Sequence, residues 1–255
     1  MREAEAPYIL LCNHESFFDF YYLSKLHHSR RPSYLVNEYY CTRPVLRRLA
    51  KPGGIVSKKL FARDMGTAVG ILRTIRRAYP IVIFPEGRLS PDGRSNPIVE
   101  SGGALYKKIR VDLVRLSGAY YASPKWRKRV FRSPVTVTVE RVVKGEELRH
   151  MSAAELDALI AAALYQDASA LRDPSYPQRN KAEGLENILY RCADCGALYT
   201  TCGKGNALRC SACGARHSLN EHYLFSETPA ASRHIMTGSA RWKNARRSES
   251  NWLRR

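Results

Sequence analysis

The sequence has no apolar run that approaches the roughly 20 residues a helix needs to cross a bilayer. Its apolar stretches, such as Tyr8–Cys12 and Leu159–Tyr165, are far shorter. Residues 1–6 also lack the apolar core of a signal peptide. We therefore expect a cytoplasmic protein, in a compartment where thiols stay reduced. The odd count of seven cysteines argues further against a disulfide framework.

Acidic residues are scarce relative to basic ones. The 255 residues include 42 Lys and Arg against 23 Asp and Glu, a formal net charge of +19. Residues 1–150 contain 28 of the basic and 13 of the acidic residues, and so carry +15 of that excess. The imbalance indicates an anionic partner: a nucleic acid, an anionic lipid surface or a phosphorylated substrate. With 44% apolar residues, the chain can still form a folded core.

Apolar stretches alternate with amphipathic segments over residues 1–170. The alternation predicts an α/β fold with a mostly parallel sheet flanked by helices. Ser152-Ala-Ala-Glu155 is a capping box that opens the last of these helices. The expected strands are 8–12, 34–36, 55–57, 81–84, 111–116 and 135–140, and the expected helices are 17–29, 43–51, 64–78, 105–110 and 152–168.

The remainder of the chain changes character. Residues 171–187 are rich in proline and polar residues and are predicted to form a linker. Residues 188–225 carry most of the cysteines and form a small separate module. Residues 226–255 form a polar, basic tail that we expect to be flexible.

The most informative local motif is Asn13-His14-Glu15-Ser16-Phe17-Phe18-Asp19, directly after an apolar strand. A turn can bring the Asp19 carboxylate onto the His14 imidazole, fix its tautomer and stabilise the imidazolium. The other ring nitrogen could then take a proton from a hydroxyl. A lone His-x4-Asp also arises by chance or as a helix cap, so the spacing alone leaves both interpretations open.

Two further segments carry candidate anion-binding groups. In Phe84-Pro85-Glu86-Gly87-Arg88-Leu89-Ser90, the glycine permits close backbone approach and Arg88 can grip an oxyanion. A simple β-turn with a solvated arginine is the alternative. In Gly53-Gly-Ile-Val-Ser-Lys-Lys59, a lysine at a strand end could meet a phosphate, although lysine pairs are usually solvated.

Together the three segments resemble the glycerolipid acyltransferase family, of the lysophosphatidate acyltransferase type. The family is marked by Asn-His-x4-Asp, Gly-x-Ile-x-x-x-Arg and Phe-Pro-Glu-Gly-x-x-Ser/Thr, in that order. Lys59 stands where the family has arginine, which keeps the charge but loses bidentate phosphate binding. The stretch Val111–Leu116 lacks the proline of the family's fourth block. The matching residues here are Asn13, His14 and Asp19; Gly53, Ile55 and Lys59; and Phe84, Pro85, Glu86, Gly87 and Ser90.

The resemblance implies an enzyme of phospholipid biosynthesis that makes phosphatidic acid. His14, supported by Asp19, would act as the base on the free hydroxyl of lysophosphatidic acid, and the acyl donor would be acyl-CoA or acyl-carrier protein. Backbone N–H groups would stabilise the oxyanion. Glycerol 3-phosphate or another lysophospholipid is the alternative acceptor. The implied substrate-binding residues are Asn13, Ser16, Gly53, Ile55, Lys59, Phe84, Pro85, Glu86, Gly87, Arg88 and Ser90, with Glu86 expected to contact a substrate hydroxyl or nearby cations.

The resemblance also bears on the membrane. Many members attach through N-terminal hydrophobic helices, and here the His14 motif begins at residue 13, so either the start is truncated or attachment is peripheral. We expect peripheral association with the anionic inner face of the cell membrane. Residues 43–51 are a candidate interfacial helix, with packing against the core as the alternative.

The cysteine module has the spacing of a zinc ribbon. Cys192-Ala-Asp-Cys195 and Cys210-Ser-Ala-Cys213 supply four thiolates, which suit tetrahedral Zn²⁺ in a structural site. Each pair is followed by a glycine that suits a tight knuckle. A zinc-ribbon nucleic-acid-binding protein is the non-enzyme alternative. It is disfavoured because the positive charge is concentrated in residues 1–150 rather than in the ribbon.

Overall fold

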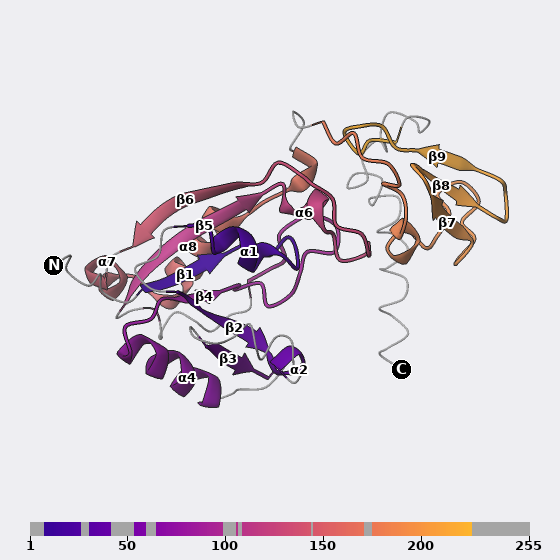
Figure 1. Ribbon diagram of the computed structural model, residues 1–255. Helices are drawn as coiled ribbons and strands as arrows, with labels where there is room; N and C mark the ends of the chain where they lie inside the picture. Colours follow the sequence, from indigo (N-terminus) through magenta and orange to yellow (C-terminus); the bar gives the residue numbers. More distant parts are fainter. Residues whose placement is uncertain are drawn as a thin grey trace.

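A six-stranded, mostly parallel sheet forms the larger part of the computed structural model, which describes residues 8–26, 31–41, 54–59, 65–98, 106, 109–143, 145–170 and 175–225. The strand order is β3-β2-β4-β1-β5-β6 (Figure 1). The first five strands are parallel and β6 runs antiparallel to β5, so the predicted α/β class is confirmed. The strands are β1 (Tyr8–Cys12), β2 (Ser33–Asn37), β3 (Ile55–Lys58), β4 (Ile81–Ile83), β5 (Arg110–Ser117) and β6 (Thr136–Val143).

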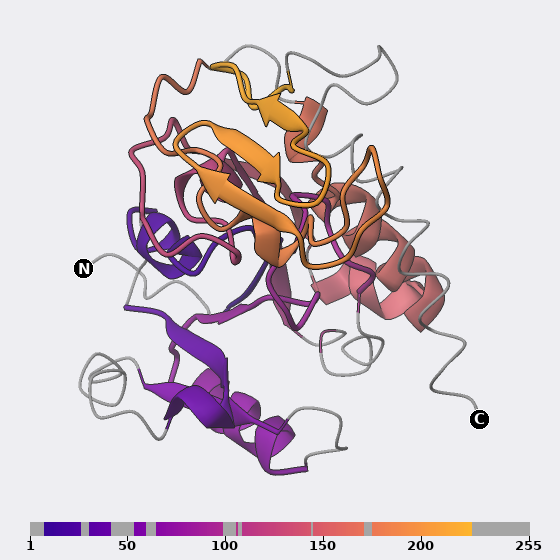
Figure 2. The ribbon, with the colours of Figure 1, turned by 90° about the vertical axis from the view of Figure 1, so that its right-hand side faces the viewer.

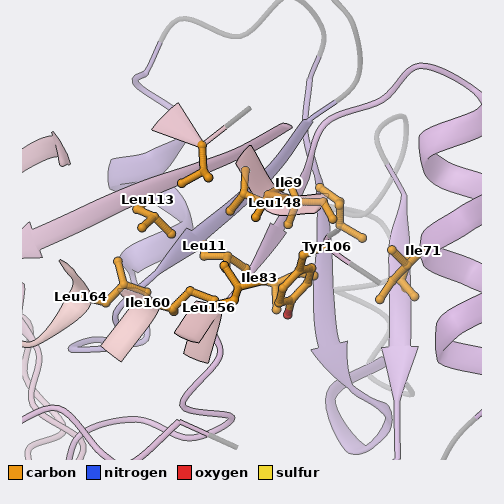
Figure 3. Close-up of a cluster of buried hydrophobic side chains, with 14 residues drawn as sticks. Ile9, Leu11, Ile71, Ile83, Tyr106, Leu113, Leu148, Leu156, Ile160 and Leu164 are labelled. Carbon is orange, nitrogen blue, oxygen red and sulfur yellow. The ribbon is translucent and has the colours of Figure 1, made fainter. Parts of the chain in front are cut away.

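Both faces of this sheet are covered, which explains why β1 is apolar throughout and fully buried. Ile9 and Leu11 point into one cluster with residues of α4 (Met65–Arg76) and α8 (Ala153–Leu164) (Figure 3). The alternate residues of β1 point into a second cluster, which includes Leu23 of α1 (Asp19–Leu23). The described residues also form the short helices α2 (Glu38–Cys41), α6 (Ala119–Ala122) and α7 (Gly145–His150).

Two of the expected helices are shorter than predicted. Of residues 17–26, the described part of the helix expected at 17–29, only Asp19–Leu23 are helical; the helix begins late because residues 16–18 form a turn held by side-chain hydrogen bonds. The helix expected at 152–168 begins with the predicted Ser152–Glu155 capping box but ends at Leu164. Beyond it the chain becomes extended and pairs with the 93–95 segment, where Ser95 N–H donates to the carbonyl of Gln166 over 2.9 Å.

Some sequence predictions fall outside the described residues. These are the end of the helix expected at 17–29, from residue 27 on, the helix at 43–51, Gly53, the start of the helix at 64, residues 171–174 of the predicted linker and the tail at 226–255. Of the helix expected at 105–110, only Tyr106, Ile109 and Arg110 are described, and Arg110 already belongs to β5.

The cysteine module contains a three-stranded antiparallel sheet, β7 (Thr201–Lys204), β8 (Ala207–Cys210) and β9 (Arg216–Ser218). It lies next to α6, beyond one end of the large sheet, and Figure 2 views the molecule from this side. The residues between the two sheets pack closely. A buried cluster joins Trp126 of the first part to Leu185 and to Leu208 of β8.

The segment predicted to be a linker is thus in part a packed connection. Tyr176, Ala182 and Leu185 are buried, and Ala182 N–H donates to the carbonyl of Gly205 over 3.0 Å. A Cβ at Gly203 would collide with the carbonyl of Ala182, so β7 approaches this segment as closely as only glycine allows. Where one domain ends and the next begins stays a prediction.

Candidate active site

The loop that follows β1, residues 13–18, is here called the His14 loop. It leaves the carboxyl edge of the sheet, where ligands of open α/β sheets bind. Asn13 is fully buried and connects the loop to β5: its amide N–H donates to the Leu116 carbonyl over 2.9 Å, and its Oδ1 accepts from Leu116 N–H at 2.7 Å. Since both groups are used by the backbone of β5, the structure gives Asn13 a role in fixing the loop. Its predicted contact with substrate stays a prediction.

His14 and Asp19 lie together as the spacing predicted. Nδ1 of His14 is 2.8 Å from Oδ2 of Asp19, and Ser16 N–H donates to both carboxylate oxygens at 3.0 Å. Asp19 is completely buried, and burial raises the pKa of its carboxyl while the hydrogen bond from His14 opposes that rise. A carboxylate so placed fixes the tautomer of the imidazole and stabilises the imidazolium.

The imidazole of His14 packs face to face against a neighbouring aromatic ring and remains partly exposed. Its ring stacks on Phe84 at 4.1 Å between centroids, with 15° between the planes. Its side chain is 21% exposed, and within the described part of the chain Nε2 has no hydrogen-bond partner. The group can therefore take a proton from a hydroxyl that approaches from solvent.

The third motif, residues 84–90, packs against the His14 loop from the neighbouring strand β4. Oε1 of Glu86 accepts from His14 N–H at 3.0 Å, and Ser90 N–H donates to the carbonyl of His14 at 2.9 Å. Oε2 of Glu86 accepts from the backbone and side-chain N–H groups of Asn96, at 2.6 and 3.0 Å. Burial raises the pKa of the Glu86 carboxyl. Both oxygens thus have protein partners, and the contact expected between Glu86 and a substrate hydroxyl stays a prediction.

The two serines of the motifs shape turns. Ser90 Oγ donates to the Arg94 carbonyl at 2.7 Å and accepts from Gly93 N–H at 2.8 Å, while Ser16 Oγ accepts from Phe18 N–H at 3.1 Å. Gly87 has a φ of 67°, a conformation that favours glycine, and leaves Arg88 exposed beside it. The Arg88 Nε–H donates to Asn96 Oδ1 at 3.1 Å. Pro85 is buried between the stacked Phe84 and Glu86.

The second motif lies farther along the same edge of the sheet. Ile55 begins β3 and Lys59 follows its last residue, with an exposed side chain. The strand order places β3 three positions from β1, which at about 4.8 Å per strand is on the order of 14 Å. Lys59 is therefore well separated from His14 along this edge, and its predicted contact with substrate stays a prediction. Gly53 lies outside the described residues.

Two further residues of the site, Asn96 and Glu15, were not predicted from the sequence. Asn96 anchors Glu86, and Glu15, directly after His14, is buried with 2% of its surface exposed. Burial raises the pKa of Glu15 well above its ordinary value, and nearby Asp19 adds to the rise. The sequence offered one signal for this: the predicted motifs contain three acidic residues, at 15, 19 and 86, more than the proposed chemistry uses, so it could have been predicted that some of them are buried.

The cysteine site has the geometry of a four-thiolate metal site. The Sγ atoms of Cys192, Cys195, Cys210 and Cys213 all lie within 4.8 Å of one another. Cys192 and Cys213 are 3.7 Å apart and Cys195 and Cys210 are 3.8 Å apart. Metal–sulfur bonds of about 2.3 Å in a tetrahedron imply sulfur separations of about 3.8 Å. The four residues therefore fit a single metal ion.

Each cysteine pair lies on a knuckle with the same local structure. Gly196 N–H donates to the Cys192 carbonyl and Gly214 N–H to the Cys210 carbonyl, at 3.1 and 3.0 Å. The two glycines have φ values of 76° and 74°. The prediction that a glycine closes each knuckle is confirmed. His217, the other nearby imidazole, binds Asp194 through Nε2 at 2.6 Å instead of joining the sulfur cluster.

The fold and the site define an α/β protein with a buried aspartate on a partly exposed histidine at the carboxyl edge of its sheet. A family model described as Acyltransferase matches residues 1–131, just over half of the chain. The chain belongs to the Acyltransferase family.

Among solved structures, the chain is similar to "the 1-acyl-sn-glycerophosphate (LPA) acyltransferase, PlsC, from Thermotoga maritima". The identity is 18% and the TM-score 0.53, over 63% of this chain and 64% of that chain. At this identity the likeness establishes the fold, a mostly parallel sheet with flanking helices. The chain spans somewhat less than two thirds of that protein. A search of curated proteins finds no match. Among the described residues, no helix is long and apolar enough to cross a membrane.

Proposed function

We propose that the protein transfers a fatty acyl group from acyl-CoA or acyl-carrier protein to the free hydroxyl of lysophosphatidic acid, giving phosphatidic acid. The observation that carries the proposal is the 2.8 Å contact between His14 and the buried Asp19, on an imidazole that stays accessible. The structurally similar PlsC is an acyltransferase named for the same acceptor class. Glycerol 3-phosphate or another lysophospholipid is the alternative acceptor.

In the proposed reaction, Nε2 of His14 takes the proton of the substrate hydroxyl as its oxygen bonds to the thioester carbonyl carbon. The carbon–sulfur bond then breaks, and the departing thiolate receives the proton from His14. Asp19 stabilises the transient imidazolium, and its own position is fixed by Ser16 N–H. Glu86 and Ser90 hold the backbone of His14 on either side of its Cα, so the imidazole starts each cycle in one place.

Lys59 and Arg88 are the proposed phosphate ligands. Both side chains are exposed, and both follow strands whose carboxyl ends lie at the edge that bears His14. Strands β3 and β1 are on the order of 14 Å apart. In the acceptor only a glycerol backbone separates the phosphate from the hydroxyl, so Lys59 must extend toward His14 to contact the phosphate. We therefore assign the nearer contact to Arg88 and the farther, more flexible one to Lys59.

We propose that the lipid is reached by peripheral attachment to an anionic membrane face, and an exposed aromatic surface beside His14 supports this. Phe17 lies 6.3 Å from Phe20 and 6.2 Å from Tyr40, ring to ring, and Lys25 lies over the ring of Tyr21 at 4.9 Å. Aromatic rings with cationic neighbours are typical of membrane interfaces. The surface comprises Phe17, Phe20, Tyr21, Tyr39 and Tyr40, between 37 and 63% exposed.

We also propose that the four cysteines bind a structural Zn²⁺. A closed set of four thiolates is typical of zinc that stabilises a fold, and a module of this size buries little apolar surface of its own. When bound, the ion would join the two knuckles and so fix β8, which ends at Cys210.

The test supplies labelled acyl-CoA or acyl-carrier protein together with lysophosphatidic acid or glycerol 3-phosphate to the full chain. We expect labelled phosphatidic acid from the wild type and a loss of about 10²–10⁴-fold in His14→Ala. His150→Ala, an exposed histidine on α7, is the matched control and should keep full activity. No product with any donor and either acceptor would refute the proposal, and full activity in His14→Ala would refute the assignment of the base.

A further inference from the structure

The side chain of Glu15 has no part in the reaction as described, yet it is buried directly behind His14. Its Oε2 accepts from Tyr120 N–H at 3.1 Å, across 105 residues of sequence. Its Oε1 is also buried and has no partner among the described groups. Burying a carboxyl group costs free energy unless the group is hydrogen-bonded. The bond that Glu15 makes connects the His14 loop to α6.

Helix α6 lies between the His14 loop and the cysteine module. All four of its residues are buried. The hydroxyl of Tyr120 accepts from Trp126 Nε1–H at 2.8 Å, and the ring of Tyr121 packs 4.5 Å from Tyr176 and 4.7 Å from Tyr223. Tyr223 belongs to the cysteine module. The four tyrosines, 120, 121, 176 and 223, are called the tyrosine cluster below.

A buried arginine connects the two parts at the same place. Arg127 is 6% exposed; its Nη1–H donates to the hydroxyl of Tyr223 at 2.8 Å, and its Nη2–H donates to the carbonyl of Tyr121 at 2.6 Å. Its guanidinium also lies 3.9 Å from the centroid of Phe131. A guanidinium inside a protein needs such partners, so removing the Tyr223 hydroxyl leaves it under-bonded.

The contacts continue from Tyr223 to the metal-binding cysteines. Tyr223 is in one buried cluster with Leu208 and Leu219, and Leu208 lies on β8 two residues before Cys210. An unbroken set of packed and hydrogen-bonded residues therefore runs from Cys210 through the tyrosine cluster to Glu15.

We propose that the cysteine module supports the His14 loop from behind, and that Glu15 is the positioning residue through which it acts. Glu86 and Ser90 hold His14 from the side of β4, and Glu15 holds the next residue from the side of α6. Without the second support the loop shifts while the substrate-binding cations stay in place. The inference rests on the proposed function, since it takes His14 to be the base. A misplacement of about 1 Å at a reacting group can lower the rate by up to about 10²-fold.

The first experiment changes Glu15 in the full chain. Glu15→Ala is expected to lower kcat by roughly 10–100-fold with KM for lysophosphatidic acid unchanged. Glu15→Gln keeps an oxygen that can accept from Tyr120 N–H, and should recover most of the lost kcat. Glu146→Ala, at an exposed position on α7, is the control. An unchanged kcat in Glu15→Ala, or no recovery in Glu15→Gln, would overturn the role of Glu15.

The second experiment starts from the cysteine module. Tyr223→Phe removes only the hydroxyl that Arg127 binds, and it should lower kcat several-fold while metal content and KM stay at wild-type values. Hydrogen exchange at residues 13–19 should become faster in Tyr223→Phe and faster still after chelation of the metal from the wild type. Because both act through one set of contacts, the effects of Glu15→Ala and Tyr223→Phe on kcat should be less than multiplicative.

Multiplicative effects on kcat, or unchanged exchange at residues 13–19 after both Tyr223→Phe and chelation, would overturn the support proposed here. The exchange measurement needs no acyl transfer. A wild type that transfers no acyl group but shows faster exchange would thus refute the proposed function while leaving the coupling between module and loop standing.

Discussion

The His14 loop and the cysteine knuckles both place reactive side chains on a tight reversal of the chain, but they are held in different ways. The hydrogen bond from Gly196 N–H to the Cys192 carbonyl closes its knuckle over four residues, and that from Gly214 N–H to the Cys210 carbonyl does the same. The His14 loop depends on Glu86 and Leu116, which are 72 and 103 residues away. One reversal is thus built locally and the other by the whole sheet.

This difference determines what each region can tolerate. A knuckle keeps its shape when distant parts of the chain change, but it needs all four thiolates to hold the module together. The His14 loop uses three buried carboxylates, at 15, 19 and 86, each with protein donors. A change to any of them is expected to alter the loop without releasing metal, whereas a change to a cysteine ligand is expected to release the metal.

The largest effect is expected for Asp19→Asn in the loop. Ser16 N–H requires an acceptor, so the new amide oxygen faces Ser16 and the amide N–H faces Nδ1 of His14. That arrangement puts the imidazole proton on Nε2, which can then no longer accept one. We expect acyl transfer to fall by about 10²–10⁴-fold with the melting temperature little changed. Asp157→Asn, on α8, is the control, and comparable activity in the two variants would contradict the pairing.

Cys213→Ala should affect the metal content and the folding of the cysteine module. Removal of one of four thiolates is expected to reduce bound metal from one ion per chain to none and to unfold the module. Cys202→Ala, an exposed cysteine on β7 outside the cluster, should retain the metal. Metal analysis with circular dichroism measures both. If Cys202→Ala lost metal and Cys213→Ala kept it, the ligand set would be wrong.

Much of the fold was predictable because its signals are local. The apolar run of β1 and the Ser152 capping box each depend on neighbouring residues only, and each is present. The helix expected at 17–29 begins only at Asp19, because hydrogen bonds to the side chains of Asp19 and Ser16 hold residues 16–18 in a turn. The packing of residues 175–187 could not be read from their polar composition, since the partners that bury Tyr176 lie in other parts of the chain.

The candidate site was predictable in part, for the same reason. The His14–Asp19 pair lies within one loop and its spacing implied the contact. The partners of Asn13 and Glu86 depend on how β5 and the 96 region pack beside β1, which no local pattern encodes. Glu15 is the clearest case, because its partner Tyr120 lies beyond β5, more than 100 residues along the chain.

Glu86→Gln tests the long-range support of the loop with a smaller expected effect. Glu86 accepts three hydrogen bonds, and an amide presents its N–H₂ to at least one of the donors of His14 or Asn96. An unmatched buried donor costs about 1–3 kcal/mol of the free energy of unfolding. Urea denaturation measures the loss, with the exposed Glu146→Gln as control. Equal stability of the two variants would show that the loop does not need this carboxylate.

Buried carboxyls also predict that the loop region is sensitive to pH. Burial raises the pKa of Glu15, so the folded protein binds its proton more tightly than the unfolded chain does. The stability that this tighter proton binding contributes is complete below the ordinary glutamate pKa. It is lost as the pH rises through the pKa that Glu15 has in the folded protein. Glu15→Gln should therefore lose less stability than the wild type as the pH rises from the ordinary glutamate pKa toward neutrality, measured by denaturant midpoint. An identical loss in both proteins would mean that Glu15 is ionised throughout.

The smallest effect is expected at Lys59, an exposed residue beyond the end of β3 that belongs to neither of the two regions compared above. A lysine bonds a phosphate as a point charge, whereas arginine offers two parallel N–H groups. Lys59→Arg is therefore expected to lower KM for lysophosphatidic acid a few-fold, and Lys59→Ala to raise it by a similar factor, with kcat unchanged in both. Lys128→Ala, at an exposed position far along the chain from the site, should leave KM unaltered. If KM were insensitive at position 59, the phosphate would be bound by Arg88 without help from β3, and the acceptor would lie entirely within the reach of the His14 loop and the 84–90 segment.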